Sequence, residues 1–114
     1  MPLPELLQKQ AQHQLDKFCR ERVPCERFQG LRLGYSFAEN HVTLYEERLN
    51  PAGEGEWLRT PVARFCYSPE LNQWVLYSID RSLRWHIYQS ITPSLNLSRL
   101  IKALDDDPIG IFWG

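Results

Sequence analysis

The chain has 114 residues with a formal net charge of -1, and 43% of its residues are hydrophobic. This length predicts one domain over residues 1–114, with enough apolar residues for a core that needs no disulfide or structural metal. The near-neutral charge argues against bulk attraction to nucleic acid or to an anionic membrane, although it leaves room for a local basic patch. Ten of the 13 basic residues are arginines, and arginine favours planar, bidentate contacts over simple solubility.

The cysteines indicate the compartment. Cys19, Cys25 and Cys66 are an odd number of thiols and cannot form a closed disulfide framework. The chain opens without the charged and apolar pattern of a secretion leader, and no apolar run approaches membrane-spanning length. We therefore expect a protein of the reducing cytoplasm that does not associate with a membrane.

A helix is the first predicted element. Pro4 suits the first position of a helix, and Pro24 ends the helical pattern. Between them the apolar residues recur at helical spacing, which predicts one buried stripe. The residues of this stripe are Leu7, Ala11, Leu15, Phe18 and Cys19.

Five strand-like runs follow, because the apolar period changes from helical spacing to two. The first two runs, 31–37 and 42–44, predict a hairpin. Residues 50–56 form a predicted loop rich in glycine, proline and glutamate. The remaining runs are 57–67, 74–80 and 84–88.

A second helix is predicted to begin with Ser94 or Asn96 as its cap and to end at the aspartates 105–107 and Pro108. The last residues, 107–114, form an apolar tail with an aromatic pair, which we expect to dock on its own sheet or on a partner. Together the elements predict an α+β domain. Its parts are an N-terminal helix, a five-stranded antiparallel meander, a C-terminal helix packed on one face of the sheet, and the tail.

The strand register predicts a binding face. If Arg81 and Ser82 form a two-residue turn, Tyr77 lies opposite His86, and the preceding turn sets Arg64 opposite Tyr77. One sheet face then becomes apolar and available to the helices. The other mixes basic, aromatic and apolar groups and suits a binding surface, with an ordinary half-solvated face as the alternative. The predicted binding residues are Arg64, Tyr77, Arg84, His86 and Tyr88.

Catalytic and metal chemistry is not indicated. Cys19 and Cys25 lack the spacing and the nearby histidine of a zinc site, and no glycine-rich loop cradles a phosphate. The three histidines, His13, His41 and His86, lie on different predicted elements, so a two-histidine site would require them to converge in space. We expect no metal and no cofactor, and these observations favour a non-catalytic protein while leaving an enzyme open as an alternative.

Several short motifs occur together over nearly the whole chain. They are Arg22-Val23-Pro24, Thr43-Leu44-Tyr45-Glu46-Glu47-Arg48, Ala63-Arg64-Phe65, Trp74-Val75-Leu76-Tyr77, Arg84-Trp85-His86-Ile87-Tyr88 and the ending Gly110-Ile111-Phe112-Trp113-Gly114. This combination resembles domain-of-unknown-function family 3024, a family of small bacterial proteins, with the ending as its most specific part. The resemblance implies an intracellular single-domain protein and assigns no activity. The family pattern has a glycine after the Asp-Arg of the last hairpin, whereas Ser82 stands here.

Three functions remain open. The first is a non-catalytic interaction module that binds a protein or a second copy of the chain, with Ile111, Phe112 and Trp113 as interface candidates. A single-stranded nucleic-acid binder is the first alternative, because Trp, Tyr and Arg on a sheet can stack bases and neutralise phosphates. A small-molecule enzyme is the second, with His86 and Tyr77 as its acid and base.

Overall fold

The computed structural model describes residues 3–22, 30–50, 52, 55–107 and 110–113. Two predicted features, Pro24 as a helix stop and the thiol of Cys25, lie outside the described residues. The described elements confirm the α+β class and the meander. They are α1 (Glu5–Arg22), β1 (Leu31–Ala38), β2 (His41–Leu49), β3 (Trp57–Ser68), β4 (Gln73–Ile79), β5 (Trp85–Ile87) and α2 (Leu97–Asp106).

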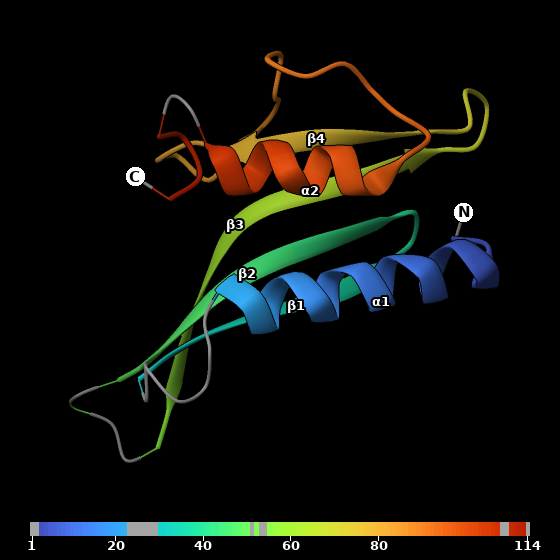
Figure 1. The fold of residues 1–114 in the computed structure, drawn as a ribbon. Helices are drawn as coiled ribbons and strands as arrows, with labels where there is room; N and C mark the ends of the chain where they lie inside the picture. The colour runs from blue at the N-terminus through green and yellow to red at the C-terminus, as the bar shows by residue number, and fades with distance from the viewer. Residues whose placement is uncertain (1–2, 23–29, 51, 53–54, 108–109, 114) are drawn as a thin grey trace.

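The sheet has two different faces. Its strands pair in the order β1-β2-β3-β4-β5, and all pairs are antiparallel. Both helices lie on the same side, α1 along β1 and α2 along β4, and they contact each other (Figure 1). No helix or strand among the described residues covers the opposite side, which we call the open face. The predicted packing of the C-terminal helix on one face is therefore confirmed.

The core lies between the helices and the sheet. The strand β4 shows the alternation that produces it: Trp74, Leu76 and Ser78 are buried, while the residues between them are half-buried on the open face. The helix α2 contributes its predicted apolar stripe of leucines and isoleucine. Its cap is Asn96, whose side-chain oxygen accepts a hydrogen bond from Ser98 N at 3.1 Å.

Beyond the helices, the sheet continues as a three-stranded arm made of the start of β1, the end of β2 and the start of β3 (Figure 1). The arm gives the molecule its long dimension of 46 Å. A β-bulge between Leu44 and Tyr45 of β2 and their partners in β3 separates the arm from the sheet under the helices. No helix among the described residues covers the open face of the arm, so side-chain pairs supply the cover there.

The register of the last hairpin corrects the prediction. His86 lies opposite Ser78 rather than Tyr77, so it belongs to the same side of the sheet as the helices. Ile87 takes the place opposite Tyr77 that was predicted for His86, and Trp85 joins the open face opposite Ile79. The observed pairs are Tyr77 with Ile87, Ser78 with His86, and Ile79 with Trp85.

The physical cause of this shift is the turn. Asp80 N donates to Arg84 O at 2.9 Å, so the turn contains three residues, 81–83, rather than two. Leu83 adopts a φ of 63°, which is the left-handed conformation that closes a three-residue hairpin turn. One additional residue reverses the facing of every side chain after it.

Candidate functional site

The open face carries two cross-strand rows of polar side chains. In the first row, Arg64 of β3 lies between Thr43 of β2 and Tyr77 of β4. In the second, Glu47 of β2 lies between Arg32 of β1 and Arg59 of β3. The second row lies in the arm, four residues along β2 from the first.

Glu47 is the centre of the second row. It is only 8% exposed although no helix covers it, because the neighbouring arginine side chains lie over it. Its carboxylate oxygens are 3.4 Å from Arg32 Nε and 3.6 Å from Arg59 Nε. Gly34 provides the space: a Cβ at this position would lie 2.9 Å from Glu47 Oε1. The row therefore fixes two arginines around one buried carboxylate.

Three arginines of the open face stack on aromatic rings. A guanidinium over a ring gains cation–π attraction while its N–H edge stays free to donate. Arg64 is held further by the hydrogen bond that its Nε donates to Thr43 Oγ1 at 3.0 Å. The distances from guanidinium carbon to ring centre are 3.8 Å for Arg32 on Trp57, 4.6 Å for Arg59 on Tyr45, and 4.3 Å for Arg64 on Trp85.

The charge of the open face is positive. Its described strand residues include three arginines and one glutamate, although the whole chain has a net charge of -1. His41 lies on the same face, and its pKa is lowered from 6.5 by burial and then by the charge of Arg64. The face thus attracts anionic groups without depending on a protonated histidine.

The predicted binding residues are divided by the structure. Arg64 and Tyr77 share a row on the open face, as predicted. Arg84 is exposed and directly follows the turn. His86 lies on the other side of the sheet, and Tyr88 is only 4% exposed, with its ring centre 4.9 Å from that of Phe112. The predicted set of five therefore does not form one surface.

Sequence reasoning missed the second row. Glu47 alternates in phase with the open face, but Arg59 lies an odd number of residues from Arg64 on β3, so strict alternation would place it on the helix side. The β-bulge returns Arg59 to the open face, and parity alone does not reveal it. Trp57 and Trp85 could not be found without the register, because one residue of shift places each on the opposite side.

His86 belongs to a turn-stabilising group. Its Nε2 lies 2.6 Å from Asp80 Oδ2, and Asp80 Oδ1 accepts the N–H groups of Ser82 and Arg84 at 2.8 and 2.9 Å. These hydrogen bonds, led by the one from Arg84, lower the pKa of Asp80. The imidazole is largely solvated, with 58% of its side chain exposed. Because Tyr77 lies on the opposite face, the proposed acid–base pair of His86 and Tyr77 has no geometric basis.

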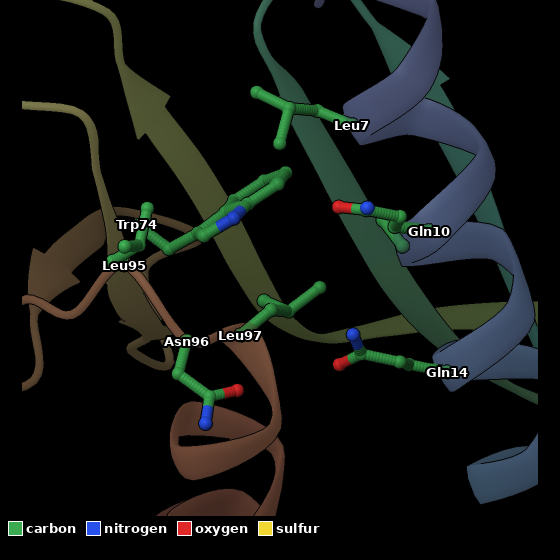
Figure 2. Close-up of a pocket in the computed structure, with 8 residues that line it drawn as sticks. Leu7, Gln10, Gln14, Trp74, Leu95, Asn96 and Leu97 are labelled. Carbon is green, nitrogen blue, oxygen red and sulfur yellow. The ribbon is translucent and has the colours of Figure 1, made fainter.

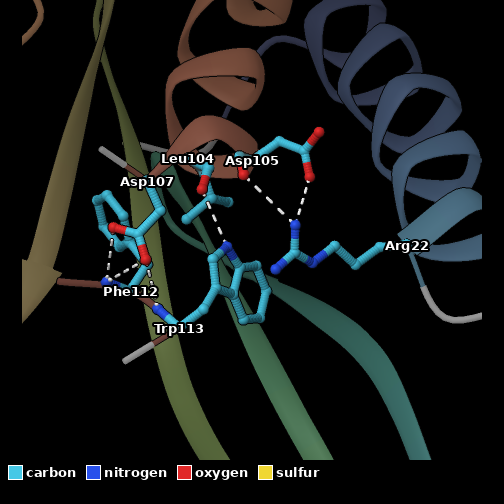
Figure 3. A network of polar contacts seen from close by, with 6 residues as sticks. All are labelled: Arg22, Leu104, Asp105, Asp107, Phe112 and Trp113. Atoms are coloured by element: carbon cyan, nitrogen blue, oxygen red, sulfur yellow. Dashed lines mark hydrogen bonds and ion pairs between the residues drawn. The ribbon is translucent and has the colours of Figure 1, made fainter. Parts of the chain in front are cut away.

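Phe112 and Trp113 of the C-terminal tail pack within their own chain (Figure 3). Phe112 is buried in the core, and Trp113 Nε1 donates to Leu104 O at 2.9 Å. The Trp113 ring also lies under the Arg22 guanidinium, whose carbon is 4.3 Å from the ring centre. Of the three interface candidates, only Ile111 is exposed, at 45%.

A cleft of about 410 Å³ lies between α1 and the start of α2 (Figure 2). Gln10 and Gln14, one helical turn apart on α1, point across it toward Trp74 and Leu97. Gln14 Oε1 is buried and has no hydrogen-bond partner among the described residues. The lining contains no titratable side chain, so the cleft offers amide hydrogen bonds and apolar contact rather than acid–base chemistry.

Two further features of the described residues concern metal binding and membrane crossing. No three of their His, Cys, Asp or Glu side chains gather as metal ligands, and none of their helices has the length and apolar character to cross a membrane. Burial raises the pKa of Cys19 to about 11, and it also raises the pKa of Cys66 against the effect of Arg64. Both thiols are therefore protonated at neutral pH and poor nucleophiles.

Comparison with known proteins identifies a family for this chain. No curated protein and no solved structure matches the chain. A family model described as a domain of unknown function (DUF3024) matches residues 3–114, which include both rows of the open face and the tail. The chain therefore belongs to the domain of unknown function family DUF3024.

Proposed function

We propose that the chain is a non-catalytic binding module whose open face binds an acidic segment of a partner protein. The observation that carries this proposal is the set of three ring-stacked arginines on a face that no described element covers. A fixed guanidinium presents its N–H fork to a carboxylate at a lower entropy cost than a free arginine. Arginine and aromatic side chains are also the residues that dominate protein interfaces.

The charges of the two rows indicate the chemistry of the partner. Glu47 neutralises one of the two arginines in its row, and Arg64 contacts the uncharged Thr43. The two rows therefore provide separate positive positions along β2, which suits a segment with spaced carboxylates. Exposed apolar side chains on the same face, Leu49 and Ile87, add contact area.

A single-stranded nucleic acid is the weaker candidate. Base stacking needs a free ring face, and the arginines lie over Tyr45, Trp57 and Trp85. The cost of displacing a stacked guanidinium opposes each such contact.

The cellular setting is part of the proposal. The uncrosslinked thiols of Cys19 and Cys66 support a reducing compartment, and we place the protein in the bacterial cytoplasm.

The test is fluorescence anisotropy with a labelled oligoglutamate peptide, with oligoglutamine of equal length and oligothymidylate as comparison probes. Arg64→Gln should weaken oligoglutamate binding about tenfold, which is about 1.4 kcal/mol. Arg64→Lys, which keeps the charge and loses the fork, should fall between wild type and Arg64→Gln.

The matched control is Arg99→Gln, an exposed arginine of α2 on the helix side. Equal losses for Arg64→Gln and Arg99→Gln would mean that only net charge is sensed. Tighter binding of oligothymidylate than of oligoglutamate would replace the proposal with the nucleic-acid alternative. Circular dichroism of each variant separates binding loss from unfolding.

A further inference from the structure

The outer edge of β1 is long, and no strand of the described residues pairs with it. Leu49 N donates to Gly30 O at 2.9 Å, so Gly30 directs its backbone toward β2. On the β2 side, even-numbered residues bond to β3 instead, as Asn40 O does when it accepts from Tyr67 N. In an antiparallel ladder the bonding alternates, so Arg32, Gly34 and Ser36 direct their backbone groups toward β2. The backbone N–H and C=O groups of the residues between them point outward, and these are Leu31, Leu33, Tyr35 and Phe37.

A groove of about 460 Å³ runs along this edge between α1 and β1. On its β1 side lie Leu33 and Tyr35, both half-buried. On its α1 side lie Asp16 and Arg20, one helical turn apart, with the Tyr35 hydroxyl donating to Asp16 Oδ1 at 2.5 Å. The helix therefore leaves the strand edge open and borders it with one negative and one positive side chain.

From this arrangement we infer that the groove binds a second copy of the chain, with the two β1 strands pairing antiparallel across a two-fold axis at Gly34. The strand is complementary to itself in this register. On the helix side Leu33 lies opposite Tyr35 of the second copy, and Leu31 lies opposite Phe37, giving apolar and aromatic cross-strand pairs. On the open face Arg32 lies opposite Ser36, so no like charges meet.

The helix charges are complementary in the same register. The helix α1 runs antiparallel to β1, since Leu3 N donates to Glu39 O at one end and Asp16 bonds Tyr35 further along. Arg20, one turn beyond Asp16, lies at the level of Leu33. The two-fold axis between Leu33 and Tyr35 therefore places Asp16 of each copy opposite Arg20 of the other, forming two symmetric ion pairs.

The opposite edge of the sheet, formed by β5, is less suited to pairing with a strand of another chain. The strand β5 has three residues, whereas β1 has eight, and the chain leaves β5 directly for the segment that leads to α2. The residues of β1 include one charge and no proline, and long edges of this kind pair with another strand unless they are protected.

The test is the oligomeric state of the full chain, measured by sedimentation equilibrium over a range of concentrations. Wild type should reach a dimer, and Asp16→Arg and Arg20→Asp should each be monomeric, because each creates two like-charge contacts. An equimolar mixture of the two variants should form a dimer again, since its two cross-chain contacts are both arginine with aspartate.

Amide hydrogen exchange identifies the surface that pairs. The outward N–H groups of Leu33 and Tyr35 should exchange more slowly at dimer concentrations than in either single variant. Their inward neighbours, Arg32 and Gly34, should be protected in every sample and report that the fold is intact.

A wild type that stays monomeric at all concentrations overturns the inference. So does a dimer that survives both charge reversals, or a mixture that remains monomeric. None of these outcomes concerns oligoglutamate binding by Arg64, so this inference and the proposed function can fail separately.

Discussion

The carboxylate of Asp107 accepts a hydrogen bond from the backbone N–H of Trp113 at 2.9 Å. It also accepts the N–H groups of Ile111, at 2.8 Å, and Phe112, at 3.2 Å. Asp107 is the C-cap of α2 with a φ of 38°, so one side chain ends the helix and folds the tail back toward the core. The spacing from Asp107 to Trp113 in this chain thus has a structural reason.

Removing this acceptor should release the tail. We expect Asp107→Ala to lower the free energy of unfolding by about 2–4 kcal/mol, because a carboxylate and three N–H groups lose their bonds. Asp107→Asn keeps one acceptor oxygen and tolerates positive φ, so it should lose less. Urea denaturation followed by tryptophan fluorescence measures both, and equal losses would contradict the contribution of the remaining acceptor oxygen.

The tail should contribute to stability mainly through Phe112. Phe112→Ala is expected to lose about 3–5 kcal/mol, because the ring is buried against Tyr88. Ile111→Ala is the matched control and should change stability by under about 0.5 kcal/mol, since Ile111 is exposed. Denaturant midpoints are the readout, and a similar cost for both variants would show that the tail is not docked.

Replacing the buried Glu47 of the open face should lower stability more than replacing the neighbouring Glu46. Glu47→Gln is expected to lower stability by about 1–2 kcal/mol, because it leaves Arg32 and Arg59 facing each other without a counter-charge. Glu46 forms its ion pair with Arg48 on the other face, where Glu46→Gln should cost under about 0.5 kcal/mol. Thermal unfolding of the two variants distinguishes them, and the reverse order would be inconsistent with the second row as described.

The lowered pKa of Asp80 predicts that the stability of the fold depends on pH. Its pKa is lowered in the folded chain, so its contribution is fully present above the unfolded value of about 4 and is lost as the pH falls through the folded pKa. Asp80→Asn lacks this contribution at every pH. The stability difference between wild type and Asp80→Asn should therefore be constant above about pH 5 and shrink below about pH 4.

The control for Asp80 is Asp106→Asn, which makes the same change in net charge at an exposed position of α2. Denaturation at a series of pH values compares the two. A difference that grows as the pH falls would give the opposite sign and contradict the lowered pKa of Asp80.

Part of the first row of the open face could be predicted from parity alone. The turn at residues 68–73 set Arg64 opposite Tyr77, and the structure confirms this pair. His86 and Tyr88 were misplaced because Leu83 enters a left-handed conformation and lengthens the last turn by one residue. Hydrophobic periodicity does not contain that information, since Ser82 and Leu83 carry no glycine signal for a positive φ.

The sequence by itself determined the α+β class, the order of the helices and strands, and the apolar stripes of α1 and α2. These follow from local periodicity and capping, which act over a few neighbouring residues. Only the tertiary structure decided that Phe112 and Trp113 dock within the chain, and that Arg32 and Arg59 lie over Glu47. Those contacts join residues far apart in sequence, and they depend on strand register and helix placement, which a one-residue change in a turn can reverse.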